Sequence, residues 1–473
     1  MQRWYLTVGL AGVAIAAAAI APNLGGWRTT PLLPAPTPTS TTPPTAMTPP
    51  ESDGHVSVEV GLDWTALLAE DTSERFLTIT LTGDPDAGER VRRPLNVAVV
   101  LDASGSMAAR GKMDYARSAA TLLVDAMDPN DSYALVTFAD DATTVVPSSS
   151  VSERKAVRRA IARVLEGGGT NLYGGLLKGA DEVRRTLDGA EVGRVILLSD
   201  GNANVGITDP GALERLAGDL SADGVSLSTV GLGMDYNEDV LAGLADLGGG
   251  SYDFVGDPQE LATAFHDELE RSARVVARNT EVILDLPPHV ELVEVIGWDV
   301  KLFEEGYAVQ VGEIYADDAK KIVARVRVTT AEAGQIQVGT VRAHYRDLVD
   351  GQRHASGAIA SATVTRDHAL LGSSVDRDNR IESTKAMGNW YLNESVKAFE
   401  QGQIIHAQEL VQQGNAVLLE AAESLGDADL ANEAKVLDAQ AATYGRVAPS
   451  SEDGRRAIKS GKERFLEKAR TKK

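Results

Sequence analysis

The sequence of 473 residues predicts a doubly wound α/β domain with a mostly parallel sheet, joined to a β-sandwich and a small C-terminal helical hairpin or bundle. Apolar strand-like runs alternate with amphipathic helical runs over residues 93–275, which is typical of a parallel sheet covered by helices. Strand-like runs without helices follow over residues 276–367 and indicate the sandwich. Helical periodicity returns over residues 376–445 and predicts two or three helices.

The N-terminal segment, residues 1–28, is expected to direct the chain out of the cytoplasm. After Arg3, the stretch from Trp4 to Ala21 carries no charge. This stretch is just long enough to cross a bilayer and longer than the usual core of a cleaved signal peptide. A retained single-pass membrane anchor is therefore favoured over a cleaved signal. With either, the rest of the chain is expected to be exported to the cell envelope.

The segments that flank the two predicted domains have distinct expected roles. Residues 29–52 are mostly Pro and Thr and are expected to form an extended spacer. Residues 53–92 contain two strand-like runs, too few to be stable alone. They are expected to complete the sandwich of residues 276–367, so that the α/β domain is inserted into it. Residues 446–473 are strongly basic and are expected to form a flexible tail.

Composition excludes several classes of function. The chain has 68 acidic and 46 basic residues and a formal net charge of −22, so nucleic acid is not an expected partner. It has no cysteine, which excludes disulfides, thiolate metal sites and thiol catalysis. The sequence also lacks a Walker loop and a G-x-S-x-G motif. The chain is therefore not expected to be an enzyme.

Three segments of the α/β region place oxygen-bearing side chains where strands or loops reach the sheet edge. An apolar run ends in a D-x-S-x-S motif formed by Asp102, Ser104 and Ser106. Thr170 lies in a glycine-rich loop, and Asp200 follows another apolar strand. In an open α/β sheet, ligands bind outside the carboxyl ends of the strands. These five residues are therefore predicted to converge there.

The predicted convergence indicates a metal ion. Two carboxylates at neighbouring strand ends repel each other unless a cation lies between them. Oxygen ligands without His or Cys favour Mg²⁺ first, with Mn²⁺ and Ca²⁺ as alternatives. Five oxygens are one short of an octahedron, so the ion should accept a carboxylate from a partner. An ordinary turn and helix cap would also explain the D-x-S-x-S motif alone, but not its combination with Thr170 and Asp200.

On these residues, the region 93–275 resembles a von Willebrand factor type A (VWA) domain with its Rossmann-like fold. The segment from Thr229 to Val255 is similar to bacterial members related to inter-α-trypsin-inhibitor heavy chains. The five positions that match the family's metal-ion-dependent adhesion site are Asp102, Ser104, Ser106, Thr170 and Asp200. The resemblance implies direct metal ligation by the three hydroxyls, and ligation by the two carboxylates directly or through water. It also implies a protein ligand that presents an Asp or Glu, and a last helix, near residues 266–276, that moves in some members.

These features are compatible with three functions. The favoured one is an exported, membrane-tethered module for adhesion or assembly, which binds a protein through a divalent cation. The alternative is an assembly scaffold in which the metal mainly braces the fold. A Mg²⁺-dependent phosphoryl-transfer enzyme is disfavoured, because position 104 is Ser where a second carboxylate would act as general acid. The identity of the partner and the oligomeric state stay open.

Overall fold

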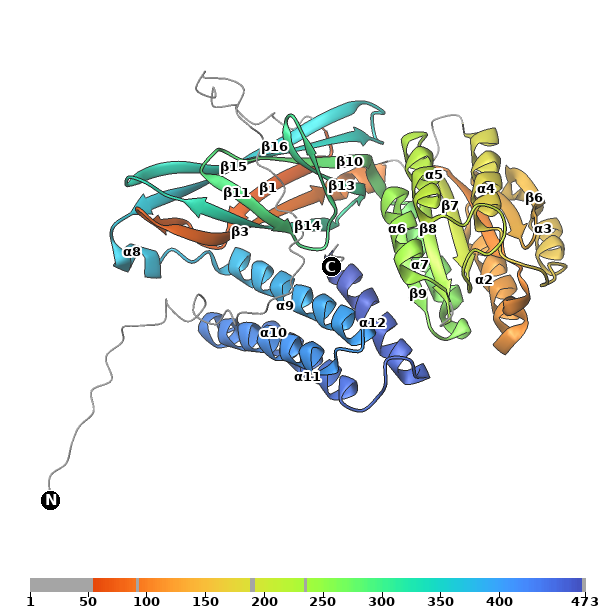
Figure 1. Ribbon diagram of the computed structural model, residues 1–473. Helices are drawn as coiled ribbons and strands as arrows, with labels where there is room; N and C mark the ends of the chain where they lie inside the picture. Colours follow the sequence, from red (N-terminus) through yellow and green to blue (C-terminus); the bar gives the residue numbers. More distant parts are fainter. Residues whose placement is uncertain (1–53, 91–92, 188–191, 234–235, 470–473) are drawn as a thin grey trace. The chain divides into compact units, whose positions relative to one another are not determined.

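The computed structural model describes residues 54–90, 93–187, 192–233 and 236–469 (Figure 1). The expected membrane anchor and Pro/Thr-rich spacer lie outside the described residues. Within the described part of the chain, no helix is both long enough and apolar enough to cross a bilayer.

A six-stranded sheet forms the centre of the α/β domain, and helices cover both of its faces (Figure 1). All strands run parallel except β6, which pairs with β5 in the antiparallel sense. In order across the sheet, the strands are β6 (Ala142–Ser150), β5 (Ser132–Phe138), β4 (Leu95–Asp102), β7 (Val192–Ser199), β8 (Val225–Leu232) and β9 (Gly249–Val255).

Strand β4 explains why the sheet needs helices on both sides. Its eight residues are all buried. Val97, Val99 and Leu101 point into one apolar core, whereas Ala98 and Val100 point into the other. The helices that cover the first face include α2 (Lys112–Ala126), α3 (Arg154–Ile161) and α7 (Leu261–Ser272). The second face is covered by α4 (Leu172–Thr186), α5 (Pro210–Ala222) and α6 (Glu238–Leu247).

The β-sandwich is assembled from strands on both sides of the α/β domain in the sequence. In the four-stranded sheet, β3 from the N-terminal side pairs with β1 and with β14, a strand that follows the α/β domain. This sheet has the order β1 (Val56–Leu62), β3 (Thr72–Gly83), β14 (Ala319–Thr329) and β11 (Val290–Val295). The other sheet has the order β12 (Val300–Phe303), β13 (Gly306–Tyr315), β10 (Val275–Asp285), β15 (Gly334–Asp347), β16 (Arg353–Thr365) and β2 (Ala66–Leu68). The predicted fold class, with the α/β domain inserted into a sandwich, is confirmed.

The C-terminal region is helical for longer than expected. Two short helices lie outside the α/β domain: α1 (Pro85–Arg90) precedes it, and α8 (His368–Gly372) follows the sandwich. After α8, four long helices pack together (Figure 1). They are α9 (Arg377–Glu400), α10 (Ile404–Leu425), α11 (Ala428–Tyr444) and α12 (Glu452–Ala469).

Helix α12 corrects the expectation of a flexible basic tail. Ile458 and Lys459 are buried, and the Lys459 ammonium bonds to Glu238 at the start of α6, at 2.7 Å. Lys462 pairs with Glu400 of α9 and with Asp239. Helix α12 is held here because its positive charges meet the acidic first turn of α6, 221 residues earlier in the sequence.

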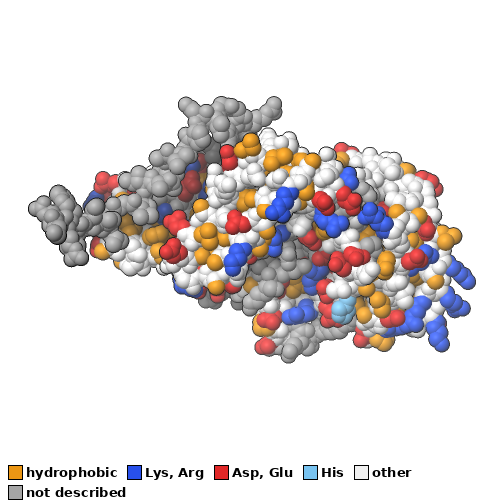
Figure 2. All heavy atoms as spheres, turned by 90° about the horizontal axis from the view of Figure 1, so that it is seen from below, with side chains coloured by type: hydrophobic (Ala, Val, Ile, Leu, Met, Phe, Trp, Pro, Cys, Tyr) orange, Lys and Arg blue, Asp and Glu red, His pale blue; other side chains and the backbone are white. Residues whose placement is uncertain are grey.

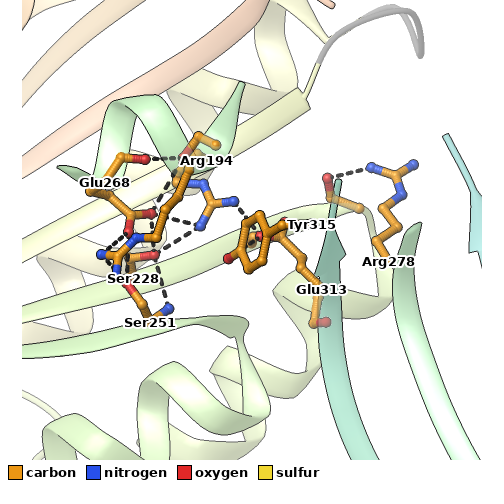
Figure 3. Close-up of polar contacts among 12 residues, drawn as sticks. Arg194, Ser228, Ser251, Glu268, Arg278, Glu313 and Tyr315 are labelled. Atoms are coloured by element: carbon orange, nitrogen blue, oxygen red, sulfur yellow. Dashed lines mark hydrogen bonds and ion pairs between the residues drawn. The ribbon is translucent and has the colours of Figure 1, made fainter. Parts of the chain in front are cut away.

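A buried ionic cluster joins the α/β domain to the sandwich (Figure 3). The guanidinium of Arg194, from β7, contacts Glu268 of α7 at 2.8 Å and also Glu313 of β13. All three side chains are almost completely buried. Arg194 lies near the start of β7, so this cluster fastens the amino end of the sheet to the sandwich.

Candidate metal centre

The pairing of β4 with β7 places two carboxylates side by side. The strands are parallel and Leu101 pairs with Leu198, so Asp102 and Ser199 end their strands at the same level. The Ser199 hydroxyl donates to Oδ2 of Asp102 at 2.7 Å. Asp200 comes next, and both carboxylates are fully buried. The parallel sheet therefore concentrates two negative charges at its carboxyl edge.

The turn after β4 brings the two serines to these carboxylates. The backbone N–H of Ser104 donates to Oδ1 of Asp102 at 2.9 Å, which folds the chain back. The hydroxyls of Ser104 and Ser106 lie 2.9 Å apart, and Ser106 donates to Oδ1 of Asp200 at 2.7 Å. Ser104 is buried and Ser106 is exposed. The serines thus form a continuous polar connection from one carboxylate to the other, open to solvent on one side.

The glycine-rich loop before α4 brings Thr170 to the same place. Gly168 has a φ of +85°, which favours glycine, and its carbonyl accepts the N–H of Gly105 at 3.1 Å. A Cβ on Gly201 would lie 3.8 Å from the Ser106 hydroxyl oxygen and 3.9 Å from that of Thr170. The structure therefore brings all five predicted residues together at one edge of the sheet.

The electrostatics of this edge call for a positive charge. Burial raises the pKa of Asp102, and the neighbouring Asp200 raises it further. Hydrogen bonds from Ser104 and Ser199 lower this pKa but do not cancel the rise. A cation between the two carboxylates would favour the ionised form of Asp102.

Lys112, which was not among the predicted site residues, supplies one such charge. It is the first residue of α2, it is buried, and its ammonium donates to Oδ2 of Asp200 at 2.6 Å. A lysine is unfavourable at a helix N-terminus, because the helix dipole is positive there. That local mismatch was the signal available in the sequence.

Three more residues that support the site were also missed. Asn204 accepts the N–H of Thr170 at 2.8 Å through its side-chain oxygen. Asp140, which follows β5, accepts the N–H of Gly169 at 2.9 Å. Ser199 bonds to Asp102 as described. Asn204 and Asp140 fix the glycine-rich loop from segments distant in sequence, so no local spacing could identify them.

The donor set fits a hard divalent cation. It consists of two carboxylates and three hydroxyls, without nitrogen or sulfur. A hollow of about 430 Å³ borders this edge, and its lining includes Gly201, Glu238, Asp239 and Glu400. Figure 2, seen from below, shows Asp and Glu side chains intermingled with Lys and Arg in the middle of the visible face, and more Lys and Arg at its right-hand end.

Comparison with known proteins identifies the domain that carries this edge. Residues 96–267 match the family model of the von Willebrand factor type A domain. This stretch is a VWA domain. An uncharacterised protein of Synechocystis is 28% identical over 292 residues, which cover 59% of this chain and 68% of the relative. Human inter-alpha-trypsin inhibitor heavy chain H4 is 31% identical over 190 residues, which cover 38% of this chain but only 20% of the relative.

A solved structure supports the same fold over most of the chain. The von Willebrand factor type A protein of Catenulispora acidiphila superposes with a TM-score of 0.65 at 18% identity, and covers 89% of this chain and 98% of that one. This likeness shows the fold alone. VWA domains are generally metal-dependent protein-interaction modules, and the relatives named here include inter-alpha-trypsin inhibitor heavy chains, as expected. Most of the heavy chain H4 lies outside the matched stretch.

Proposed function

We propose that this protein is a metal-dependent protein-binding module, with a divalent cation at the carboxyl edge of the VWA sheet. The ligands would be Asp102, Ser104, Ser106, Thr170 and Asp200. Mg²⁺ is the preferred ion, with Mn²⁺ and Ca²⁺ as alternatives. When bound, the cation would supply a positive centre that attracts a carboxylate. The chain's own residues hold the site together through the hydrogen bonds from Ser104 to Asp102 and from Ser106 to Asp200.

One observation carries this proposal. The two carboxylates at the site are fully buried, whereas the Ser106 hydroxyl that bonds to Asp200 belongs to an exposed residue. An ion held at this point would therefore be buried on the protein side and reachable from solvent. Since two carboxylates and three neutral hydroxyls leave a divalent cation one ligand short of an octahedron, an Asp or Glu of a protein partner would complete it. No step of this function requires a catalytic base.

The direct test is Mn²⁺ binding by the full chain, followed by electron paramagnetic resonance. We expect the wild-type chain to bind one Mn²⁺ at this edge, and Asp102→Ala and Asp200→Ala to weaken binding at least 100-fold. Asp141→Ala removes an exposed carboxylate from the turn after β5 and serves as the matched control. Equal binding by Asp200→Ala and the wild type would refute the assigned site.

Partner capture tests the second half of the proposal. The immobilised full chain should retain envelope proteins from the producing cell in Mg²⁺ and release them in EDTA, and Asp200→Ala should retain none of them. Capture that survives both chelation and Asp200→Ala would rule out a bridging cation.

A scaffold role is the second candidate, favoured by the contacts of α12. Lys459 connects α12 to the VWA domain by bonds to the Tyr236 carbonyl and to Glu238. On this proposal, the helical region and sandwich make the main contacts and the metal braces the fold. Mg²⁺ would then raise the melting temperature and leave partner capture unchanged.

Export and membrane tethering by residues 1–28 also belong to the proposal. They rest on the uncharged stretch after Arg3 and not on the described residues. A chain with a retained anchor should stay with the membrane pellet after alkaline carbonate extraction; release into the supernatant would contradict tethering.

A further inference from the structure

A second group of possible metal ligands lies on the sandwich, at the turn that joins β15 to β16. Ligand atoms of Asp347, Asp350 and His354 all lie within 4.8 Å of one another. Ions of the zinc class, at about 2 Å from each ligand, bring their ligand atoms to separations within this limit. The group belongs to different elements from the VWA edge and contains nitrogen, which that edge lacks.

Backbone N–H groups of the turn hold one carboxylate oxygen of Asp347 and one of Asp350. Oδ1 of Asp347 accepts the N–H of Val349 at 2.7 Å, and Oδ1 of Asp350 accepts the N–H of Gln352 at 2.8 Å. The second oxygen of Asp350 lies 2.7 Å from Nε2 of His354. The carboxylates are therefore held in place by the backbone, and Asp350 directs its other oxygen at an imidazole.

The start of the described chain adds a second imidazole. Nδ1 of His55 lies 2.8 Å from Oδ2 of Asp347, and the backbone N–H of His55 donates to the same oxygen at 2.8 Å. An ideal Cβ on Gly54 would lie 2.8 Å from the ring of His354, so the chain passes directly against that ring. The His55 imidazole thus reaches Asp347 from a distant segment, beside the group formed by Asp347, Asp350 and His354.

The side chains of this group differ in exposure in a way that would let an ion enter from solvent. The side chain of Asp347 is fully buried, whereas those of His354, His55 and Asp350 are 10%, 22% and 40% exposed. The buried carboxylate would anchor an ion, and the exposed one leaves a path for its entry. Carboxylates that are themselves hydrogen-bonded hold ligands in a fixed orientation, as in protein metal sites.

We propose that Asp347, Asp350 and His354 form a binding site for a divalent transition metal of the zinc class, with His55 beside Asp347. Imidazole and carboxylate ligands suit Zn²⁺, whereas Mg²⁺ and Ca²⁺ prefer oxygen alone. The ion would replace the direct contact between the His354 imidazole and the Asp350 carboxylate. It would hold the segment around His55 against the turn between β15 and β16, and it is independent of the proposed ion at the carboxyl edge of the VWA sheet.

The test is a calorimetric titration of the full chain with Zn²⁺ in excess Mg²⁺, which keeps the all-oxygen edge supplied with its preferred ion. We expect one Zn²⁺ per chain at this site. His354→Ala and Asp350→Asn should each weaken its affinity at least tenfold. His344→Ala is the matched control, since His344 is exposed on the same strand, three residues before Asp347. Asp102→Ala should retain the Zn²⁺ affinity, which separates this site from the VWA edge.

Two results would overturn the proposal. One is no measurable Zn²⁺ binding by the wild-type chain. The other is binding that is equal in the wild type, His354→Ala and Asp350→Asn. Because Asp350 is exposed and Asn preserves its shape, Asp350→Asn is expected to fold, and circular dichroism of each variant checks this. A visible absorption spectrum of the Co²⁺ form should show four-coordinate bands that His354→Ala loses and His344→Ala keeps.

Discussion

Arg194→Met is expected to lower the free energy of unfolding by about 3–5 kcal/mol, because it leaves two carboxylates buried without their shared cation. Figure 3 shows the guanidinium between Glu268 of α7 and Glu313 of β13. Burial alone would raise the pKa of Glu268, but Arg194 and Arg271 outweigh it and lower this pKa to about 2. Urea denaturation of the full chain should show the loss as a lower midpoint.

The pH dependence gives this prediction a second readout. The pKa of Glu268 is depressed in the folded wild type, from 4.5 to about 2. Its stabilising contribution is therefore present above about pH 4.5 and is lost as the pH falls toward 2. In Arg194→Met, Arg194 no longer offsets the burial of Glu268, so protonation of this carboxyl on acidification removes part of the cost. The difference in stability between wild type and variant should be largest near neutral pH and should shrink on acidification.

Two further variants separate the buried cluster from a general loss of charge. Arg184→Met breaks a surface ion pair with Asp223 and should change stability by less than about 1 kcal/mol. Arg194→Met combined with Glu268→Gln and Glu313→Gln removes the unpaired charges and should recover part of the loss. Equal midpoints for Arg194→Met and the wild type would show that this cluster does not stabilise the junction.

Lys112→Met is expected to increase the affinity of the VWA edge for Mg²⁺ by about tenfold or more. The Lys112 ammonium lies 2.6 Å from Oδ2 of Asp200, so it would lie within a few ångströms of an ion bound there. At an effective dielectric constant of about 20, like charges at that separation repel by several kcal/mol, and about 1.4 kcal/mol corresponds to a tenfold change in affinity. Isothermal titration calorimetry with Mg²⁺ measures the change.

Lys155→Met is the matched control for this prediction. It removes the same charge from an exposed position on α3 and should leave the affinity nearly unchanged, because solvent and salt screen it. A weaker Mg²⁺ affinity in Lys112→Met would mean that the lysine holds Asp200 in place and does not compete with the ion.

The α/β architecture could be predicted because its signals are local. The run from Val97 to Leu101 is apolar at every position, as a strand buried on both faces must be, and it ends in Asp102. Because ligands bind at the carboxyl edge of such a sheet, Asp200 and the loop that contains Thr170 could be predicted to lie beside Asp102. The strands that precede the VWA domain were assigned to the sandwich because two strands cannot be stable alone.

The missed features all depend on partners that are distant in sequence. Arg194 interrupts an apolar strand, and the carboxylates that compensate it lie 74 and 119 residues later. Lys459 belongs to a segment so basic that it resembles a solvated tail, and its partner Glu238 lies 221 residues earlier. A charge pattern within one segment cannot reveal such pairs, and only the folded sheet and helices bring them together.

The attachment of the VWA domain at both ends of its sheet has a mechanical consequence. If only the two chain connections near Pro94 and Arg274 joined it to the sandwich, the VWA domain would be free to rotate about them. The Arg194 cluster and the Lys459 contact restrain it from opposite ends. A partner held at the carboxyl edge would therefore be presented in a constant direction, and tension on that partner would pass straight into the sandwich instead of first turning the domain.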